Sequence, residues 1–373
     1  MRGGSSRGPF FLASDLPSDV ATRDRVLLAV MGSPDRRQID GLGGAHPLTS
    51  KVGIVNKSST TGVALDFLFA QLQPDKDTVD TTPNCGNMLA AVVPFALERG
   101  LIEAQGDTTT VRVLTLNTDM QCDITVQTPM TPNGRRVRYT GNARIDGVPG
   151  TSAPITINFL DTAGSVCHGL LPTGRVKDRV TVRGAGCDAF TLDVTCIDNG
   201  MPLVIFNASD IGATGYESVA ELNANAALKA RIEALRLLAG PLMGLGDVTD
   251  KNYPKMTLIA APRHGGSIST RSFIPHVCHD AIGVLAAVTV ATACVLKGSV
   301  CDGVAQMPES DEPTVSVEHP TGELSVALGL DPANPQNVKK AALLRTARLI
   351  MRGEVMVPSD VFIKNNKLTM QIK

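Results

Sequence analysis

The sequence predicts an α+β fold of two similar domains, each with a mostly antiparallel sheet wrapped around a central apolar helix. Three observations support this prediction. Segments of the first half recur in the same order in the second half. Two segments alternate apolar and polar residues around a polar turn, which is typical of β-hairpins. The run 282–296 is apolar on every side, as in a helix that is covered all round. The expected domains span residues 1–176 and 177–373.

The internal repeat sets the order of the expected elements. It begins with an apolar strand ending in Ala-Ser-Asp or a close variant, and continues with an amphipathic helix that Gly and Pro end. A second strand, a small-residue turn opening an apolar helix, a hairpin and a weaker sixth match follow. The paired segments are 8–17 and 201–212, 23–44 and 229–248, 51–58 and 255–262, 84–96 and 280–293, 110–126 and 314–328, and 143–155 and 347–363.

Two irregularities accompany the repeat. A strand at 190–200 precedes its second copy, whereas Met1 lies inside the first copy. We therefore expect the natural chain to begin earlier by roughly one strand, or to have lost an opening strand. Pro94 falls inside the first apolar helix and is expected to kink it, because proline removes a helical hydrogen bond.

Composition excludes several classes of function. The chain has 373 residues, 43% of them hydrophobic and 19% charged, with a net charge of −1. This balance gives no electrostatic basis for binding nucleic acid or a membrane surface. The longest apolar run is shorter than the roughly 20 residues that span a bilayer, and the N-terminus lacks a signal peptide, so we expect a cytoplasmic protein. The eight cysteines form no C-x-x-C pair, and zinc is not expected.

The motif Asn84-Cys85-Gly86-Asn87 opens the first apolar helix. Free N–H groups at a helix start favour a bound carboxylate and lower the pKa of a thiol. Gly86 lets a ligand approach the backbone closely. Cys85 is therefore a candidate acid, base or nucleophile. An ordinary helix cap with an incidental cysteine explains the position equally well.

Lys51 begins an apolar strand after Leu48-Thr49-Ser50. A lysine that is partly buried at a strand start can serve as a base, because burial disfavours its charged form. An exposed strand-end charge is the commoner situation for an arbitrary lysine. Lys255 holds the equivalent place in the second repeat and is interpreted as such a strand-end charge.

The second helix start, Asp280-Ala281-Ile282-Gly283, carries Ala281 where the first carries Cys85. If a pseudo-twofold axis relates the domains, both helix starts can face one cleft and bind a substrate with a carboxylate at each end. Other candidates each have a plain structural explanation as well. They are the donor-rich loop 2–8, the guanidinium of Arg271 beside Ser272, the imidazoles of His276 and His279, and the turn 198–200.

Several long motifs resemble the PrpF-type isomerases, within the broader diaminopimelate epimerase fold. They are MRGGSSRG, MGSPDRRQIDGLGGAHPLTSK, NCGNMLAAVVPFALERG, CIDNGMP, TRSFIPHVCHDAIGV and GEVMVPS. The resembled family includes 2-methylaconitate isomerases and the 4-oxalomesaconate isomerases, or tautomerases, of aromatic-acid breakdown, including that of lignin-derived acids. MGSPDRRQIDGLGG and ALERGL look nearest to the oxalomesaconate branch.

The resemblance implies two like domains with the site between them, no cofactor and a small tricarboxylate substrate. It assigns the general base to Lys51 and the active-site thiol to Cys85. Epimerases of this fold use two cysteines, so Ala281 is a departure from them, and the short N-terminus is a departure from the PrpF-type proteins. A homodimer is compatible with the sequence, which does not fix the oligomeric state. The substrate contacts that the resemblance implies are Ser5, Ser6, Asn84, Gly86, Asn87, Arg271, Ser272, Ile282 and Gly283.

The expected activity is a cofactor-independent 1,3-allylic proton shift on 4-oxalomesaconate. The alternative within the same family is cis–trans isomerisation of 2-methylaconitate or aconitate. An amino-acid epimerase of the same fold would need a second thiol, and Ala281 argues against it. A non-catalytic tricarboxylate-binding protein is the remaining alternative.

Overall fold

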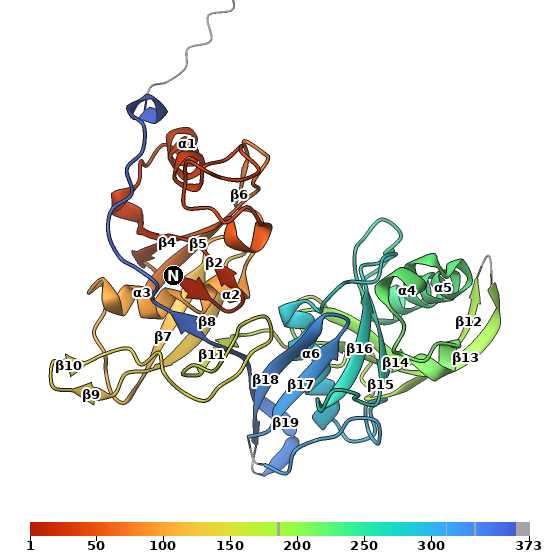
Figure 1. Ribbon diagram of the computed structural model, residues 1–373. Helices are drawn as coiled ribbons and strands as arrows, with labels where there is room; N and C mark the ends of the chain where they lie inside the picture. Colours follow the sequence, from red (N-terminus) through yellow and green to blue (C-terminus); the bar gives the residue numbers. More distant parts are fainter. Residues whose placement is uncertain (185–186, 311, 332, 363–373) are drawn as a thin grey trace, which may run out of the picture. The chain divides into compact units, whose positions relative to one another are not determined.

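The computed structural model describes residues 1–184, 187–310, 312–331 and 333–362 (Figure 1). The chain divides into two compact units, the first made of Met1–Arg144, Val148–Ile157 and the segment from Arg345 onward, and the second of Ile145–Gly147 and Asn158–Leu344. The chain therefore passes from the first unit into the second near residue 158, rather than after residue 176 as expected. The chain also returns to the first unit, because β20 (Ala347–Arg348) pairs with β1 (Arg2–Gly3) near the N-terminus.

The first unit is built on a sheet with the strand order β8-β7-β5-β4-β3, and β6 pairs with β5 beside this path. The β3–β4 and β5–β7 pairs are parallel and the others are antiparallel. A smaller sheet has the order β2-β1-β20. The elements are β2 (Ser6–Arg7), β3 (Phe10–Leu12), η1 (Ala13–Asp15), α1 (Val20–Met31), η2 (Pro47–Thr49), β4 (Lys51–Lys57), β5 (Leu65–Leu72), β6 (Val79–Asp80), α2 (Gly86–Leu89), α3 (Val92–Glu98), β7 (Thr108–Thr115), β8 (Met120–Gln127), β9 (Met130–Thr131), β10 (Gly134–Arg135), β11 (Ile155–Phe159), which reaches into the second unit, and η4 (Ser359–Phe362).

The second unit is built on a sheet with the order β12-β13-β14-β15-β16-β17-β18-β19. Its β14–β15 and β16–β17 pairs are parallel and the other pairs are antiparallel. The elements are β12 (Asp178–Gly184), β13 (Cys187–Asp198), β14 (Pro202–Asn207), η3 (Ala208–Ile211), α4 (Val219–Ala224), α5 (Ala226–Leu242), β15 (Lys255–Ala260), β16 (Ile268–Phe273), α6 (Val284–Val295), β17 (Thr314–His319), β18 (Gly322–Asp331) and β19 (Asn334–Arg345).

The two units repeat one topology, and this confirms the predicted α+β fold class. The series β3-η1-α1-β4-β5, a helix, β7-β8 in the first unit matches β14-η3-α5-β15-β16-α6-β17-β18 in the second. Parallel and antiparallel pairs also fall at the same steps. The strand expected at 190–200 is the end of β13, which pairs with β14. In the described part of the first unit, the sheet path ends at β3.

The sixth match of the repeat does not form matching elements. In the first unit, Ala143 and Ser152 make an isolated antiparallel bridge. The second copy holds only β20 and a 3-10 turn at Ser359–Phe362, and its residue 363 lies outside the described residues. The weak sequence similarity between the two segments of this sixth match therefore does not reflect a shared strand.

Helix ends follow from local chemistry. Asp19 caps α1 by accepting a hydrogen bond from the Thr22 N–H at 3.0 Å, and the helix ends at Gly32, which has a left-handed φ of 74°. The helix expected over 23–44 is therefore shorter, and 33–44 forms a loop. The apolar helix expected over 84–96 is split into α2 and α3. Pro94 accounts for this break, because it cannot donate to the carbonyl of Ala90 and its ring crowds that carbonyl.

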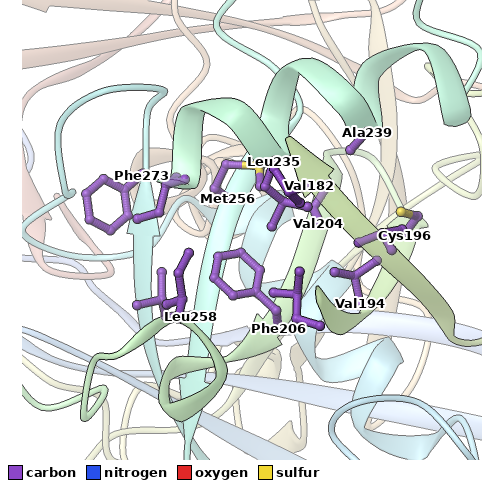
Figure 2. Packing of buried hydrophobic residues seen from close by; sticks show 14 of the residues in the cluster. Val182, Val194, Cys196, Val204, Phe206, Leu235, Ala239, Met256, Leu258 and Phe273 are labelled. Atoms are coloured by element: carbon purple, nitrogen blue, oxygen red, sulfur yellow. The ribbon is translucent and has the colours of Figure 1, made fainter. Parts of the chain in front are cut away.

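The core of the second unit lies between α5 and the strands β12 to β16 (Figure 2). Because aromatic residues are scarce, this cluster is made mainly of aliphatic side chains and cysteine, with Phe206 and Phe273 as its large members. Residues labelled in Figure 2 are Val182, Val194, Cys196, Val204, Phe206, Leu235, Ala239, Met256, Leu258 and Phe273.

The central helix α6 confirms the interpretation of the run 282–296. Every side chain from Ala286 to Cys294 in this helix is buried, as expected for a helix that is apolar all round. Among the described residues, no helix is both long and apolar enough to cross a bilayer.

Candidate active site

Lys51 and Cys85 meet in the first unit. Lys51 is the first residue of β4 and Cys85 is the N-cap residue of α2; each is only 8% exposed. The Nζ of Lys51 donates a hydrogen bond to the Sγ of Cys85 over 3.4 Å. The alternative interpretation of Lys51 as an exposed strand-end charge is therefore wrong. A buried amine in contact with a thiol is an arrangement that can exchange a proton.

The surroundings of Lys51 fix its position. Its Nζ lies 5.4 Å from the centroid of the Phe69 ring, within the range of a cation–π interaction. The preceding residue, Ser50, is buried and donates to the Oε1 of Gln38 at 3.0 Å. Gly8 runs directly over the strand, because a Cβ at this position would collide with the carbonyl of Lys51. The start of β4 is thus held from both sides.

Cys85 is oriented by the residue before it. The Oδ1 of Asn84 accepts from the Cys85 N–H at 2.8 Å, and the Asn84 Nδ2 donates to the Thr115 Oγ1 at 3.3 Å. Helix α2 has only 4 residues. A helix this short aligns few peptide dipoles, so the helix-start effect expected for Cys85 and Gly86 has less support than the sequence suggested.

Ser5 and Asn87 also meet in the first unit. The Nδ2 of Asn87 donates to the Ser5 Oγ at 3.2 Å. Gly4 makes this approach feasible: it has a φ of 51°, and a Cβ there would collide with the Asn87 side chain. Ser6 is 1% exposed, and its Oγ has no hydrogen-bond partner among the described residues.

The donor-rich N-terminal loop is tied down rather than flexible. The Nη1 of Arg2 donates to the carbonyls of Gly4 at 2.8 Å and Thr346 at 3.1 Å. Gly4 N–H also donates to the Thr346 carbonyl at 2.8 Å. Arg2 thus supports the turn that carries Ser5 and Ser6.

Arg345 was not singled out by the sequence. Its Nε donates to the Oδ1 of Asn87 at 3.0 Å, across 258 positions of the chain. A contact between residues so far apart leaves no local pattern, and none of the repeat segments includes Arg345. The contact forms because the chain returns to the first unit at Arg345.

Arg271 and Ser272 lie on β16 of the second unit, and both are buried. Arg271 was expected to bind a substrate carboxylate through two of its N–H donors. Its Nε instead donates to the Glu217 carbonyl at 2.8 Å, and its Nη1 to the Thr270 carbonyl at 2.8 Å. Burial lowers the pKa of Arg271. The Ser272 Oγ lies 2.9 Å from the Thr257 Oγ1.

Ile282 and Gly283 stand at the start of α6, with Gly283 as its N-cap residue and Ile282 buried. Lys255 lies close by, since its Nζ is 3.8 Å from the place that a Cβ on Gly283 would take. Burial lowers the pKa of Lys255. Because Lys255 is partly buried, the interpretation of it as an exposed strand-end charge does not hold.

The remaining candidates of the second unit have structural contacts. The Nδ1 of His279 accepts from the Ala281 N–H at 2.8 Å. His276 is exposed and its Nδ1 lies 3.5 Å from the Glu233 Oε2. In the turn 198–200, the Asp198 carboxylate accepts from the Val166 and Cys167 N–H groups at 2.8 and 2.9 Å. These contacts explain the residues without a ligand.

Lys51 and Cys85 bring together two side chains that can exchange a proton. Among the described residues, no group of three or more His, Cys, Asp or Glu side chains is placed to hold a metal ion. Two contacts between candidate residues stand out in this unit, one between the Lys51 amine and the Cys85 thiol and one between the Asn87 amide and the Ser5 hydroxyl.

Comparison with known proteins agrees with these features. The family model described as "PrpF protein" matches residues 1–358. The chain is 56% identical to the (4E)-oxalomesaconate Delta-isomerase of Novosphingobium sp. strain KA1, over 96% of each chain. It is 51% identical to the 4-oxalomesaconate tautomerase of Pseudomonas putida, over 97% of this chain and 96% of the other. The crystal structure of a methylitaconate-delta-isomerase superposes with a TM-score of 0.81 at 32% identity, covering 98% of this chain and 96% of that one. The chain belongs to the PrpF family.

Proposed function

We propose that this protein is an isomerase that moves a proton, and with it a double bond, along a three-carbon unit of 4-oxalomesaconate. The observation that carries the proposal is the buried contact between the Lys51 Nζ and the Cys85 Sγ at 3.4 Å. The substrate is proposed from two relatives named for oxalomesaconate, which are 56% and 51% identical over nearly the whole chain.

Lys51 is the proposed base. As a free amine it takes a proton from the carbon next to the C=C bond. The electron pair of that C–H bond forms a new C=C bond, and the pair of the old C=C bond moves toward the conjugated carbonyl oxygen. The product of this step is a dienolate and an ammonium group on Lys51. Conjugation already acidifies the carbon, which makes the proton easier to remove. A positioned general base typically raises the rate of such a step by roughly 100- to 10,000-fold.

The second step returns a proton at the other end of the three-carbon unit. The dienolate oxygen releases its electron pair, the carbonyl re-forms, and a new C–H bond closes the 1,3-shift. The proton comes from the Cys85 thiol or from the Lys51 ammonium. If the thiol supplies the proton, the Lys51 ammonium passes its own proton to the thiolate across the hydrogen-bond contact between Nζ and Sγ. If the ammonium supplies it, Lys51 returns directly to the free amine, so in both cases the two groups end as they began.

Hydroxyl and amide donors are proposed to hold the substrate carboxylates. Ser5, Ser6 and Asn87 are suited to this, since hydroxyl and amide protons donate to carboxylate oxygens. One donor aimed at developing negative charge is worth about 2.7–4 kcal/mol in a transition state. The further substrate contacts that we propose are Asn84, Gly86, Arg271, Ser272, Ile282 and Gly283.

The reaction is proposed to serve the breakdown of aromatic acids, including lignin-derived ones, in the cytoplasm and without a cofactor. The second candidate activity is isomerisation of 2-methylaconitate or aconitate. It is favoured by the match to the 2-methyl-aconitate isomerase of Shewanella oneidensis at 34% identity, over 96% of each chain. An amino-acid epimerase is disfavoured, because Ala281 replaces the second thiol and burial raises the pKa of the nearby Cys278 to about 11.

Proton NMR in heavy water tests the proposal. The protein is incubated with 4-oxalomesaconate, with cis- and trans-aconitate, and with proline. We expect double-bond migration and deuterium uptake with 4-oxalomesaconate, and slower or no change with the aconitates. Deuterium uptake at the α-carbon of proline would indicate an epimerase. Tight tricarboxylate binding without any exchange would indicate a binding protein.

A further inference from the structure

Arg345, Asn87 and Ser5 form a chain of two directed hydrogen bonds in the first unit. Arg345 ends β19 and is 9% exposed. Its Nε donates to the Asn87 Oδ1 at 3.0 Å, and the Asn87 Nδ2 donates to the Ser5 Oγ at 3.2 Å. Asn87, the middle member of this chain of bonds, lies two residues after the proposed catalytic Cys85.

The chemistry of the three groups fixes the direction of both bonds. A guanidinium has donors only, so the side of the Asn87 amide that faces Arg345 must be its oxygen. The NH₂ group then faces Ser5, whose Oγ accepts. A hydroxyl that accepts on one lone pair keeps its own proton for another acceptor. Ser5 is half-buried, so this proton can be offered to a ligand.

The same C-terminal segment also holds the turn that carries Ser5. Arg2 of β1 pairs with Arg348 of β20. The Gly4 N–H donates to the Thr346 carbonyl at 2.8 Å, and the Arg2 Nη1 donates to the Thr346 Oγ1 at 2.9 Å. Residues 345–348 therefore set both the position of Ser5 and the orientation of the amide beneath it.

We infer that Arg345 is a positioning residue, which acts through Asn87 to aim the Ser5 hydroxyl proton at a carboxylate of the substrate. This role rests on the proposed function, but Arg345 itself is not among the residues that the proposed function uses. Without Arg345, the Asn87 amide is free to turn its oxygen toward Ser5. Ser5 would then donate its proton to Asn87. The lone pairs of the Ser5 Oγ would face the substrate carboxylate, and no hydrogen bond would form between these two acceptors.

A double-mutant cycle tests this inference. Arg345→Met, Ser5→Ala and the double variant are compared with the wild type for kcat and KM with 4-oxalomesaconate. One lost hydrogen bond to a charged group corresponds to a rise in KM of roughly 10- to 100-fold. We expect Arg345→Met and Ser5→Ala each to raise KM in this range with a smaller effect on kcat. We expect the double variant to be no worse than Ser5→Ala, because both changes remove one contact.

Two further variants keep the test decisive. Arg345→Lys retains a donor for the Asn87 Oδ1 and should recover most of the affinity. Asn87→Asp retains the acceptor for Arg345 but cannot donate to Ser5, so it should raise KM even though its bond to Arg345 is charged. If Arg345→Met does not fold, the cycle is run with Asn87→Asp and Ser5→Ala instead.

The outcomes separate this inference from the proposed function. Fold-changes that multiply in the double variant, or an Arg345→Met variant with wild-type KM, would overturn the positioning role while wild-type turnover stands. A wild-type protein without turnover of 4-oxalomesaconate contradicts the proposed function, and with it this inference.

Discussion

The Nζ of Lys51 lies 3.4 Å from the Sγ of Cys85, although 34 positions separate the two residues. Lys51 is the first residue of β4 and Cys85 is the N-cap residue of α2, so the contact joins the start of the strand to the start of the helix. Both side chains are buried, so few water molecules compete with the contact. In the sequence each residue also had an ordinary explanation, and their contact is what supports the proposed common role.

Replacing Cys85 by serine tests how the proton is returned. A hydroxyl keeps a hydrogen-bond partner for Lys51 but is a far weaker acid than a thiol. We expect Cys85→Ser to lower kcat by about 100-fold or more, as is usual for the loss of a general acid, while exchange of the substrate proton with solvent continues. Steady-state kinetics and NMR exchange measure the two steps separately. A variant with the wild-type kcat would assign both proton transfers to Lys51.

Gly8 is expected to be required for the placement of Lys51. A Cβ on Gly8 would collide with the Lys51 carbonyl, and backbone cannot yield as a flexible side chain does. We expect Gly8→Ala to lower the free energy of unfolding by about 1–3 kcal/mol and to reduce kcat. Gly353→Ala is the matched control, since a Cβ there meets no atom within 4 Å. Urea unfolding of both variants measures the difference, and equal stability would contradict the packing argument.

Arg236 is expected to be the most costly arginine to remove in the second unit. It is fully buried, and its Nε donates to the Glu233 Oε2 at 2.7 Å. Its Nη1 donates to the carbonyls of Val248 at 2.7 Å and Lys251 at 3.0 Å. Arg236→Met would leave these carbonyls without their donor and remove the arginine charge from the Glu233 carboxylate, and we expect a loss of about 3–5 kcal/mol.

The control for Arg236 is an exposed ion pair. Arg179 is 73% exposed and its Nη1 lies 3.3 Å from the Asp193 Oδ1. We expect Arg179→Met to change the free energy of unfolding by less than about 1 kcal/mol. Thermal or urea unfolding of the two variants decides between the buried and the exposed case. A small loss in Arg236→Met would show that its carbonyl contacts contribute little.

His279 is expected to make folding stability depend on pH. Burial and the positive charge of Lys255 lower the pKa of His279, while Asp280 opposes them. A lowered pKa means that the unfolded chain binds a proton more readily than the folded one. The free energy of unfolding should therefore fall as the pH drops below the ordinary histidine pKa of 6.5.

The measurement compares wild type with His279→Gln. Urea unfolding is recorded at about pH 7.5 and about pH 5.5, on either side of the unfolded pKa. We expect the wild type to lose more stability than the variant between these two conditions. Equal losses would mean that His279 keeps its ordinary titration in the folded protein.

The fold could be predicted from the sequence to a large extent. Strands β4 and β15, the hairpins β7–β8 and β17–β18, and the buried helix α6 all follow from periodicity and apolar runs. One feature depended on tertiary contacts instead. The chain returns to the first unit at Arg345 because β20 pairs with β1, and no local pattern indicates such a pairing.

The site was predictable only in part, for a similar reason. Lys51 and Cys85 each had an ordinary explanation, and burial decides against it for Lys51. Arg271 matched the pattern of a carboxylate fork, but two of its donor groups serve backbone carbonyls. The repeat position of Lys255 did not reveal its partial burial, and Arg345 had no local signal, since burial and a contact across 258 positions are properties of the folded chain.

The direct test of the central claim is solvent deuterium incorporation by Lys51→Met, with Lys57→Met as the control. Lys57 lies at the exposed end of the same strand, so its variant should behave as the wild type. We predict that Lys51→Met folds, binds 4-oxalomesaconate, and shows neither double-bond migration nor deuterium uptake by NMR. Turnover and deuterium uptake at the wild-type rate in folded Lys51→Met would contradict the assignment of Lys51 as the base.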